Sequence, residues 1–278
     1  MRKSPIAGTW YPGEKQTLLR QIEDYFAQAK PSEVNGRIFA VISPHAGMQW
    51  SGQAAAYGYK LLKGKNIKRV IVLGPSHRVG FRGLATSGED FYETPLGRLK
   101  VDREISDALY KNPLFQGSRM AEMQEHSLEM QLPFLQVALG EFSLVPLVVG
   151  ELSKKDYTEA AKVLLPYVDS STLVVASSDF THYGVGFDYL PFSSNIKENL
   201  KKLDEGAIRK IIAKDFDGYL NYVEETGATI CGTRPIGIIL KMLPASARGT
   251  LLKYYTSGDL TGDFSHSVSY ASVVFSVD

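Results

Sequence analysis

The sequence has a single cysteine, Cys231, so the chain can form no internal disulfide. A lone thiol is typical of proteins from a reducing compartment, and we therefore expect a cytoplasmic protein. No apolar run approaches the roughly 20 residues that a membrane-spanning helix needs. Residues 1–10 also lack the apolar core of a secretory signal, so the sequence predicts no membrane attachment.

An excess of charge of one sign is also absent. The chain has 31 basic and 30 acidic side chains, which are interspersed, and its net charge is +1. A surface for nucleic acid or for anionic lipids would need a basic cluster that this sequence lacks. We therefore expect neither nucleic acid nor a membrane among its partners.

Several common catalytic and cofactor motifs are missing as well. The sequence has no G-x-S-x-G elbow, no H-E-x-x-H pair and no C-x-x-C site. The segment Gly58–Asn66 resembles a phosphate loop, but its glycine spacing is wrong and no Ser or Thr follows Lys65. Candidate functional residues must therefore be sought outside these motifs.

Short apolar, β-branched runs alternate with amphipathic segments along the chain. Continuous apolar character is typical of strands buried on both faces. These runs are Arg37–Ser43, Arg69–Gly74, Phe142–Val149, Thr172–Ser177 and Val268–Val277. Helices are expected over Glu14–Lys30, Gly52–Lys63, Asp102–Lys111, Lys154–Tyr167, Ser194–Ala213 and Gly232–Leu243. The alternation predicts an α/β fold, with one domain over residues 1–278 and a central, mostly parallel sheet flanked by helices.

A further helical pattern runs through the leucines between residues 128 and 139. Pro133 lies inside this pattern, and proline removes a helical hydrogen bond and clashes with the preceding turn. Proline is nevertheless favoured at the first position of a helix. We therefore expect Pro133 to kink this segment or to start a new helix.

Three of the five histidines follow predicted strands. His45 comes after the first strand, His77 after the second and His182 after the fourth. A single histidine in such a place is most often an ordinary loop residue. Because ligands of open α/β sheets bind beyond the carboxyl ends of the strands, three such histidines favour a shared site. Imidazole is the commonest metal ligand in proteins, so a metal site is predicted, with His45 and His77 as the stronger pair.

Cys231 precedes the helix expected over Gly232–Leu243. A thiol at a helix N-terminus has a lowered pKa, which would make Cys231 a metal ligand or a nucleophile. The alternative is that Cys231 is a small buried side chain, as most free cysteines are.

Two other histidines have plainer interpretations from their surroundings. The leucine pattern places His126 and Glu129 away from the core, one helical turn apart, where they could line a pocket or face solvent. The residues alone favour the solvent-facing position. His266 lies in a turn-rich stretch and is interpreted as structural.

Taken together, several motifs of this chain resemble the Memo family, known in bacteria and archaea as protein B of the AmmeMemoRadiSam system. The motifs are Ala7-Gly8-Thr9-Trp10-Tyr11-Pro12, Pro44-His45-Ala46-Gly47, Leu73-Gly74-Pro75-Ser76-His77, Glu125-His126-Ser127-Leu128-Glu129-Met130-Gln131-Leu132-Pro133, Ser177-Ser178-Asp179-Phe180-Thr181-His182-Tyr183-Gly184 and Cys231-Gly232. They occur in the family's order from residue 7 to residue 232, so the resemblance covers nearly the whole chain.

The resemblance implies a fold like that of the LigB-like extradiol dioxygenases, which hold Fe(II) with two histidines and a carboxylate. Carried over, His45 and His77 match the histidine ligands, and Cys231 takes the place of the carboxylate. His182 matches the acid/base histidine. A thiolate in the ligand set softens the site and moves its preference toward Cu(I), Zn(II) or thiolate-bound iron.

The resemblance also implies roles for other residues of these motifs. His126, Glu129 and Trp10 are expected to bind substrate, which moves His126 from solvent into a pocket. The spacing in the sequence gives a role to Asp179, which lies three residues before His182. If this turn is helical, both side chains face the same way, and Asp179 is expected to orient that imidazole for proton transfer.

Three functions remain open at this point. The first is a redox enzyme that uses iron or copper, with zinc as a further possibility, on a small substrate. The second is a non-catalytic protein that binds a metal or a peptide, and the third is a metal-free hydrolase with Cys231 as nucleophile and His182 as base. The resemblance also implies a radical SAM partner protein, which would hold any iron–sulfur cluster.

Overall fold

The computed structural model describes residues 1–278, which fold around one ten-stranded sheet. The strands are β1 (Arg37–Ser43), β2 (Arg69–Pro75), β3 (Leu84–Thr86), β4 (Phe91–Thr94), β5 (Gly97–Val101), β6 (Ser143–Val149), β7 (Thr172–Ser177), β8 (His182–Tyr183), β9 (Arg248–Thr256) and β10 (Ser267–Val277). The helices are α1 (Lys15–Gln28), α2 (Met48–Lys60), α3 (Arg103–Tyr110), α4 (His126–Glu129), α5 (Leu132–Leu139), α6 (Lys154–Leu164), α7 (Ile196–Ile212), α8 (Phe216–Thr226), α9 (Thr233–Met242) and α10 (Ser257–Thr261). Short 3-10 turns lie at Pro113–Phe115, Arg119–Glu122, Leu165–Tyr167 and Val185–Phe187.

The centre of the sheet is parallel and its margins are antiparallel. The order is β4-β5-β6-β2-β7-β1-β10-β8, and the five strands from β5 to β1 run parallel to one another. β10 lies antiparallel beside β1, and β3, β4, β8 and β9 also pair antiparallel. The predicted α/β domain with a mostly parallel central sheet is therefore confirmed, although the last predicted strand runs in the opposite direction.

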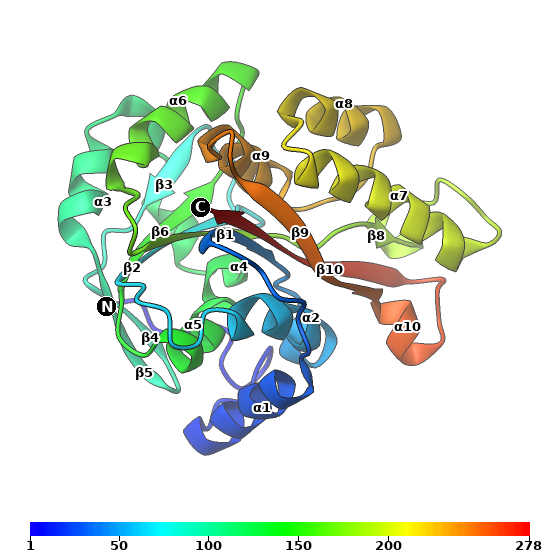
Figure 1. Cartoon of the computed structure of the whole chain (residues 1–278), viewed down its shortest axis with the longest axis horizontal. Coiled ribbons are helices and arrows are strands. Elements are labelled where there is room, and N and C mark those ends of the chain that lie inside the picture. Colours follow the sequence, from blue (N-terminus) through cyan, green and yellow to red (C-terminus); the bar gives the residue numbers. More distant parts are fainter.

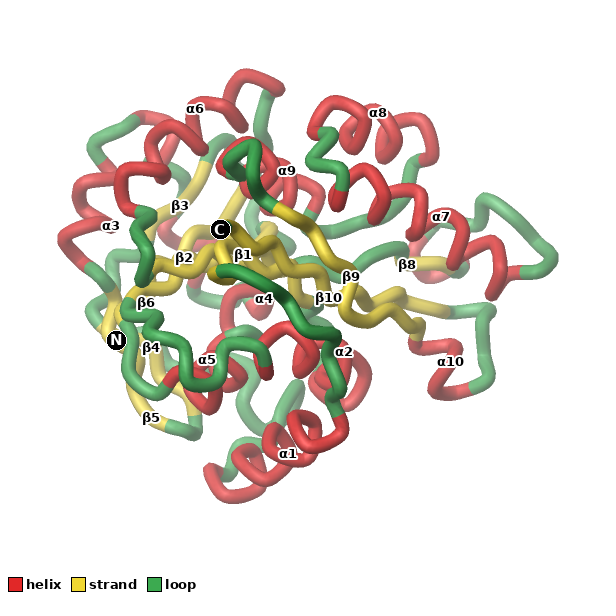
Figure 2. The backbone as a smooth tube through the Cα atoms, in the orientation of Figure 1, coloured by secondary structure: helices red, strands yellow, loops and turns green.

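Helices cover both faces of this sheet (Figures 1 and 2). On one side α6, α7, α8 and α9 pack together, and on the other α1, α2 and α5 do so. Alternate residues of the central strands enter the two cores: Ile71 joins one, whereas Val70 and Val72 join the other, and all three are fully buried. This two-sided burial explains why these strands are continuously apolar in sequence.

The predicted interruption of the leucine-rich segment is also present. α4 ends at Glu129, and α5 begins at Leu132 with Pro133 in its first turn, where a missing amide proton costs no hydrogen bond. The break separates His126 from the longer helix, so that α4 is a single turn at the carboxyl edge of the sheet. None of the helices combines the length and apolar character needed to cross a membrane.

Candidate metal centre and cavity

The carboxyl ends of the parallel strands open into a cavity of about 670 Å³. His45 and His77 follow β1 and β2 directly, and His182 begins β8, shortly after β7. The predicted convergence of these three side chains is present. The cavity is lined by all five histidines of the chain, His45, His77, His126, His182 and His266.

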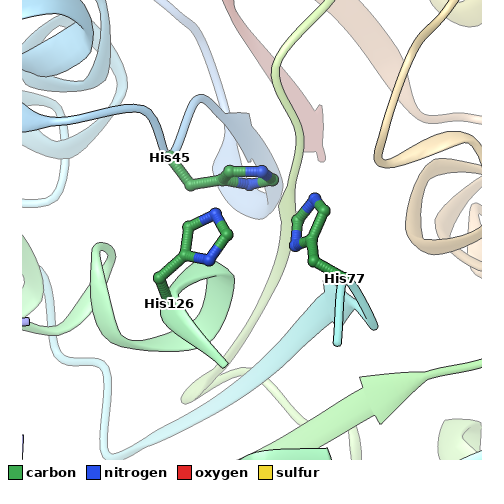
Figure 3. Close-up of side chains that lie close together, drawn as sticks. All are labelled: His45, His77 and His126. Carbon is green, nitrogen blue, oxygen red and sulfur yellow. The ribbon is translucent and has the colours of Figure 1, made fainter. Parts of the chain in front are cut away.

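Three of these imidazoles form a compact group. The ring centroids lie 5.2 Å apart for His45 and His77, 5.3 Å for His45 and His126, and 4.6 Å for His77 and His126. One ring nitrogen from each lies within 4.8 Å of the other two. Figure 3 shows the three rings turned toward a common centre from three separate segments of the chain.

Hydrogen bonds fix the tautomer of His45. The hydroxyl of Ser177 donates its only proton to the carbonyl of Ser127 at 2.6 Å and accepts from the side-chain amide of Gln131 at 2.7 Å. Its contact with Nδ1 of His45, at 2.8 Å, therefore requires that Nδ1 donates. Nε2 of His45 is left with a free lone pair, which is the form that binds a metal.

Glu125 fixes His77 in the same way. The carboxylate accepts from the amide of His77 at 2.7 Å and from its Nδ1 at 2.8 Å, and Nδ1 of His126 lies 3.4 Å away. Burial alone would raise the pKa of Glu125, but the hydrogen bonds and charge of His77 lower it to about 2. The carboxylate is therefore ionised and accepts from Nδ1 of His77, which in the neutral imidazole leaves Nε2 free to coordinate.

Burial also favours the neutral forms of His45 and His126. It lowers the pKa of His45 well below its usual value, and the neighbouring charge of His77 acts in the same direction. Burial together with the charges of His45 and His77 lowers the pKa of His126 to about 3. Nδ1 of His126 is buried without a hydrogen-bond partner, a feature that a bound ligand would explain.

A second potential ligand group shares His45. Nε2 of His45 lies 3.2 Å from the sulfur of Cys231, and these two residues form a compact group with Asp179. Two ligands of one ion, with bonds of about 2.1 Å to nitrogen and 2.3 Å to sulfur, are roughly 3.1–3.6 Å apart. The distance between His45 and Cys231 therefore fits two ligands of one transition-metal ion.

The expected lowering of the Cys231 pKa is wrong. Burial raises the pKa of the thiol well above its usual value, and the charge of Asp179 adds to this effect. Proximity to the start of α9 does not outweigh these two contributions. Metal coordination would favour the thiolate, because a bound cation compensates the buried negative charge.

Gly232 allows the thiol to approach β7. A Cβ atom at this position would lie 2.2 Å from Cβ of Ser178 and 2.7 Å from the carbonyl of Ser177, both impossible contacts. The absence of a side chain therefore lets the Cys231 turn pack directly against the end of β7. This close approach accounts for the Cys-Gly pair in the sequence.

The expected contact between Asp179 and His182 is not formed. Oδ1 of Asp179 accepts from the amides of His45 and Ala46 at 2.8 and 3.2 Å, whereas Nδ1 of His182 lies 3.0 Å from the carbonyl of Thr229. The prediction assumed a helical turn, but residues 178–181 form no helix and His182 begins a strand. The Thr229 carbonyl can only accept, so Nε2 of His182 is left free at the cavity wall.

Of the three residues expected to bind substrate, Trp10 and His126 line the cavity and Glu129 does not. Trp10 lines the cavity and packs against His126, with ring centroids 4.2 Å apart. Glu129 lies outside it, fully buried and ion-paired to Arg2. The solvent-facing interpretation of His126 is wrong, because this side chain is buried in the cavity wall.

Sequence reasoning missed two residues of the site. His266, interpreted as structural, lines the cavity mouth and stacks on Phe187 at 4.4 Å. Glu125 holds the imidazole of His77 in place through two hydrogen bonds. Its position directly before a histidine in the motif was the only available signal, and nothing in the spacing shows that it reaches back to His77.

The family model and the sequence relatives both match this chain over nearly its full length. A family model described as Memo-like protein matches residues 2–274. MEMO1 family protein TV1383 of Thermoplasma volcanium is 34% identical over 283 residues, covering 99% of this chain and 98% of the relative. Protein MEMO1 of Homo sapiens is 33% identical over 291 residues, covering 99% of this chain and 97% of the relative. The crystal structure of uncharacterized protein JW3007 from Escherichia coli K12 is similar in fold, with a TM-score of 0.52 at 14% identity, covering 86% of this chain and 99% of that one.

Proposed function

The chain belongs to the Memo-like protein family, and from this premise we propose that it binds a transition metal through His45, His77 and Cys231. One observation carries the proposal. Two imidazoles whose tautomers leave Nε2 free meet at the edge of the sheet, and a thiol sulfur lies 3.2 Å from one of them. His126 and Asp179 flank this set and could complete it.

The donors favour a soft or borderline ion. Two imidazoles and a thiolate suit copper, iron or zinc better than magnesium or calcium, which prefer oxygen ligands. Iron or copper is the choice for a redox function. Such an ion would supply electron transfer and polarise a bound substrate atom, as in the LigB-like dioxygenases, to which the Memo family is similar in fold.

The cavity suits a small molecule or the end of a peptide. We propose that Trp10 and His126 contact this ligand, since both lie in the wall beside the clustered imidazoles. His182, with Nε2 free and Nδ1 held by Thr229, would accept or donate a proton there. Asp179 would act by holding the turn that carries His45, through the amides of His45 and Ala46.

The metal-free hydrolase is less well supported by the geometry. The imidazole next to Cys231 is His45, whose free Nε2 could accept the thiol proton, whereas His182 bonds to the carbonyl of Thr229. The raised pKa of Cys231 also disfavours a standing thiolate nucleophile. A metal-binding protein without catalysis remains the second candidate, because the same ligand geometry serves storage or sensing of an ion.

Replacing Cys231 by serine tests the ligand assignment. We expect Cys231→Ser to weaken Cu(I) binding by more than about tenfold and Mn(II) binding far less, because a hydroxyl is a harder donor than a thiolate. Competition titrations with chelators under anaerobic conditions would measure both affinities. Equal losses for the two ions would show that the thiol is not a ligand.

Replacing His182 by alanine tests the proton-transfer role. We expect near-normal iron affinity and melting temperature, with substrate-dependent oxygen uptake reduced by about 10²–10⁴-fold. Metal titration, thermal unfolding and oxygen-electrode rates would be measured on one preparation. A variant that loses metal as completely as one lacking His45 would identify His182 as a ligand instead.

A further inference from the structure

Arg2 is almost completely buried, with 1% of its surface exposed, and lies behind the segment that carries Glu125 and His126. Figure 1 shows the N-terminus beside β4, at the edge of the sheet. We infer that Arg2 is a positioning residue for the candidate metal centre. The inference rests on the proposed metal-binding function, and it concerns how the ligands are held in the protein itself.

The guanidinium group binds three residues of one short segment. Nε donates to the carbonyl of Glu122 at 2.7 Å, Nη2 to the carbonyl of Glu125 at 2.8 Å, and Nη1 to the carboxylate of Glu129 at 2.5 Å. The planar fork of arginine provides donors in these three directions at once, which the single ammonium of lysine cannot do. Arg2 therefore fixes the backbone just before His126 and holds the side chain of Glu129 just after it.

The hydrogen bonds of Arg2 to Glu122, Glu125 and Glu129 form a clamp, and Glu125 connects this clamp to the imidazoles. Arg2 binds its backbone carbonyl, while its carboxylate binds the amide and Nδ1 of His77 and the amide of Ser127. A displacement of the Glu125 backbone would move the carboxylate and release His77 from the orientation that leaves its Nε2 free. Arg2 thus acts on the cluster through Glu125, without contact to the cavity.

The clamp is anchored to the sheet at its other end. The amide of Arg2 donates to the carbonyl of Phe91, the amide of Glu93 donates to the carbonyl of Arg2, and the guanidinium lies over the ring of Tyr92. The same N-terminal stretch then reaches the opposite side of the segment, where Trp10 packs on His126. Residues 2–10 therefore contact this segment twice, through Arg2 at the carbonyls of Glu122 and Glu125 and through Trp10 at the ring of His126.

The test compares Arg2→Lys with Glu129→Gln. Both variants disturb the same buried ion pair, but only Arg2→Lys removes the bonds to the carbonyls of Glu122 and Glu125. Nitrogen NMR of imidazole-labelled, metal-free protein would report the tautomers of His77 and His126, and chelator competition would report Cu(I) affinity. We expect Arg2→Lys to shift both imidazole signals and to lower the affinity by about tenfold or more.

Glu129→Gln is expected to lower the melting temperature about as much as Arg2→Lys does, but to leave the imidazole signals of His77 and His126 unchanged. The signal of His182 serves as an internal control in every sample. Unchanged signals of His77 and His126 in folded Arg2→Lys protein, or equal shifts in both variants, would overturn the inference. If Arg2→Lys does not fold, the double variant Arg2→Met with Glu129→Gln removes both buried charges and is judged by the same criterion. Shifted signals in a protein whose wild type binds no Cu(I) would uphold the positioning role and refute the proposed function.

Discussion

Replacing His45 by alanine is expected to abolish metal binding, with an affinity loss of more than about 100-fold. His45 is the one residue common to both potential ligand groups, so its removal leaves neither group complete. His77 and His182 cannot take its place, because Glu125 and the carbonyl of Thr229 hold their rings at other positions. Elemental analysis after anaerobic purification and calorimetric titration with Cu(I) and Fe(II) would measure the loss.

His266→Ala provides the matched control for this experiment. His266 lines the same cavity but is exposed at its mouth and stacks on Phe187, away from the clustered donors. We expect this variant to retain metal binding within about threefold of the wild type, since no coordinating atom is removed. Comparable losses in the two variants would mean that the ion binds elsewhere in the cavity.

Replacing Glu125 by glutamine is expected to weaken metal binding by about 10–100-fold, although Glu125 is not proposed as a ligand. Its carboxylate accepts three hydrogen bonds, two of them from His77. An amide of the same shape has only one acceptor oxygen, so its NH₂ group must face one of these donors. If His77 responds by moving its proton to Nε2, that nitrogen can no longer coordinate.

Two measurements separate this effect from a general loss of stability. Nitrogen NMR of the metal-free variant should show a changed tautomer for His77 and an unchanged one for His182. Glu151→Gln, at an exposed carboxylate paired with Arg234, is the control and should leave affinity and tautomers unaltered. Normal metal affinity in Glu125→Gln would contradict the assignment of Glu125 as the residue that orients His77.

The central strands were predictable because both of their faces are buried. β1 and β7 occupy the residues that the apolar runs indicate, since every interior position there must be apolar. β9 was missed because most of its residues are only partly buried, so its sequence shows neither a continuous nor an alternating apolar pattern. β4 and β5 were missed because they are short and only partly apolar: β4 exposes Phe91, and β5 exposes Arg98 and Lys100.

Only those residues of the site that lie just after strands could be placed from the sequence. His45, His77 and His182 were placed together because parallel strands end at one edge. The position of His126 depends on residues that lie more than a hundred positions away in the sequence: Arg2 binds the carbonyl of Glu125, and Trp10 packs on the His126 ring. No local sequence pattern predicts such contacts. The pairing of Asp179 failed for a related reason: sequence spacing suggested a helical turn where residues 178–181 form no helix.

The place of β10 in the sheet has a consequence for the order of events during translation. β1 carries His45 at its end, and it lies between β7 and β10, whose residues 267–277 are synthesised long after it. Until those residues emerge from the ribosome, one edge of β1 has no partner and the cavity lacks the wall that Val268 and Tyr270 provide. Loading of an ion at the proposed site should therefore follow the synthesis of β10, and a nascent chain stalled before residue 267 should bind it poorly.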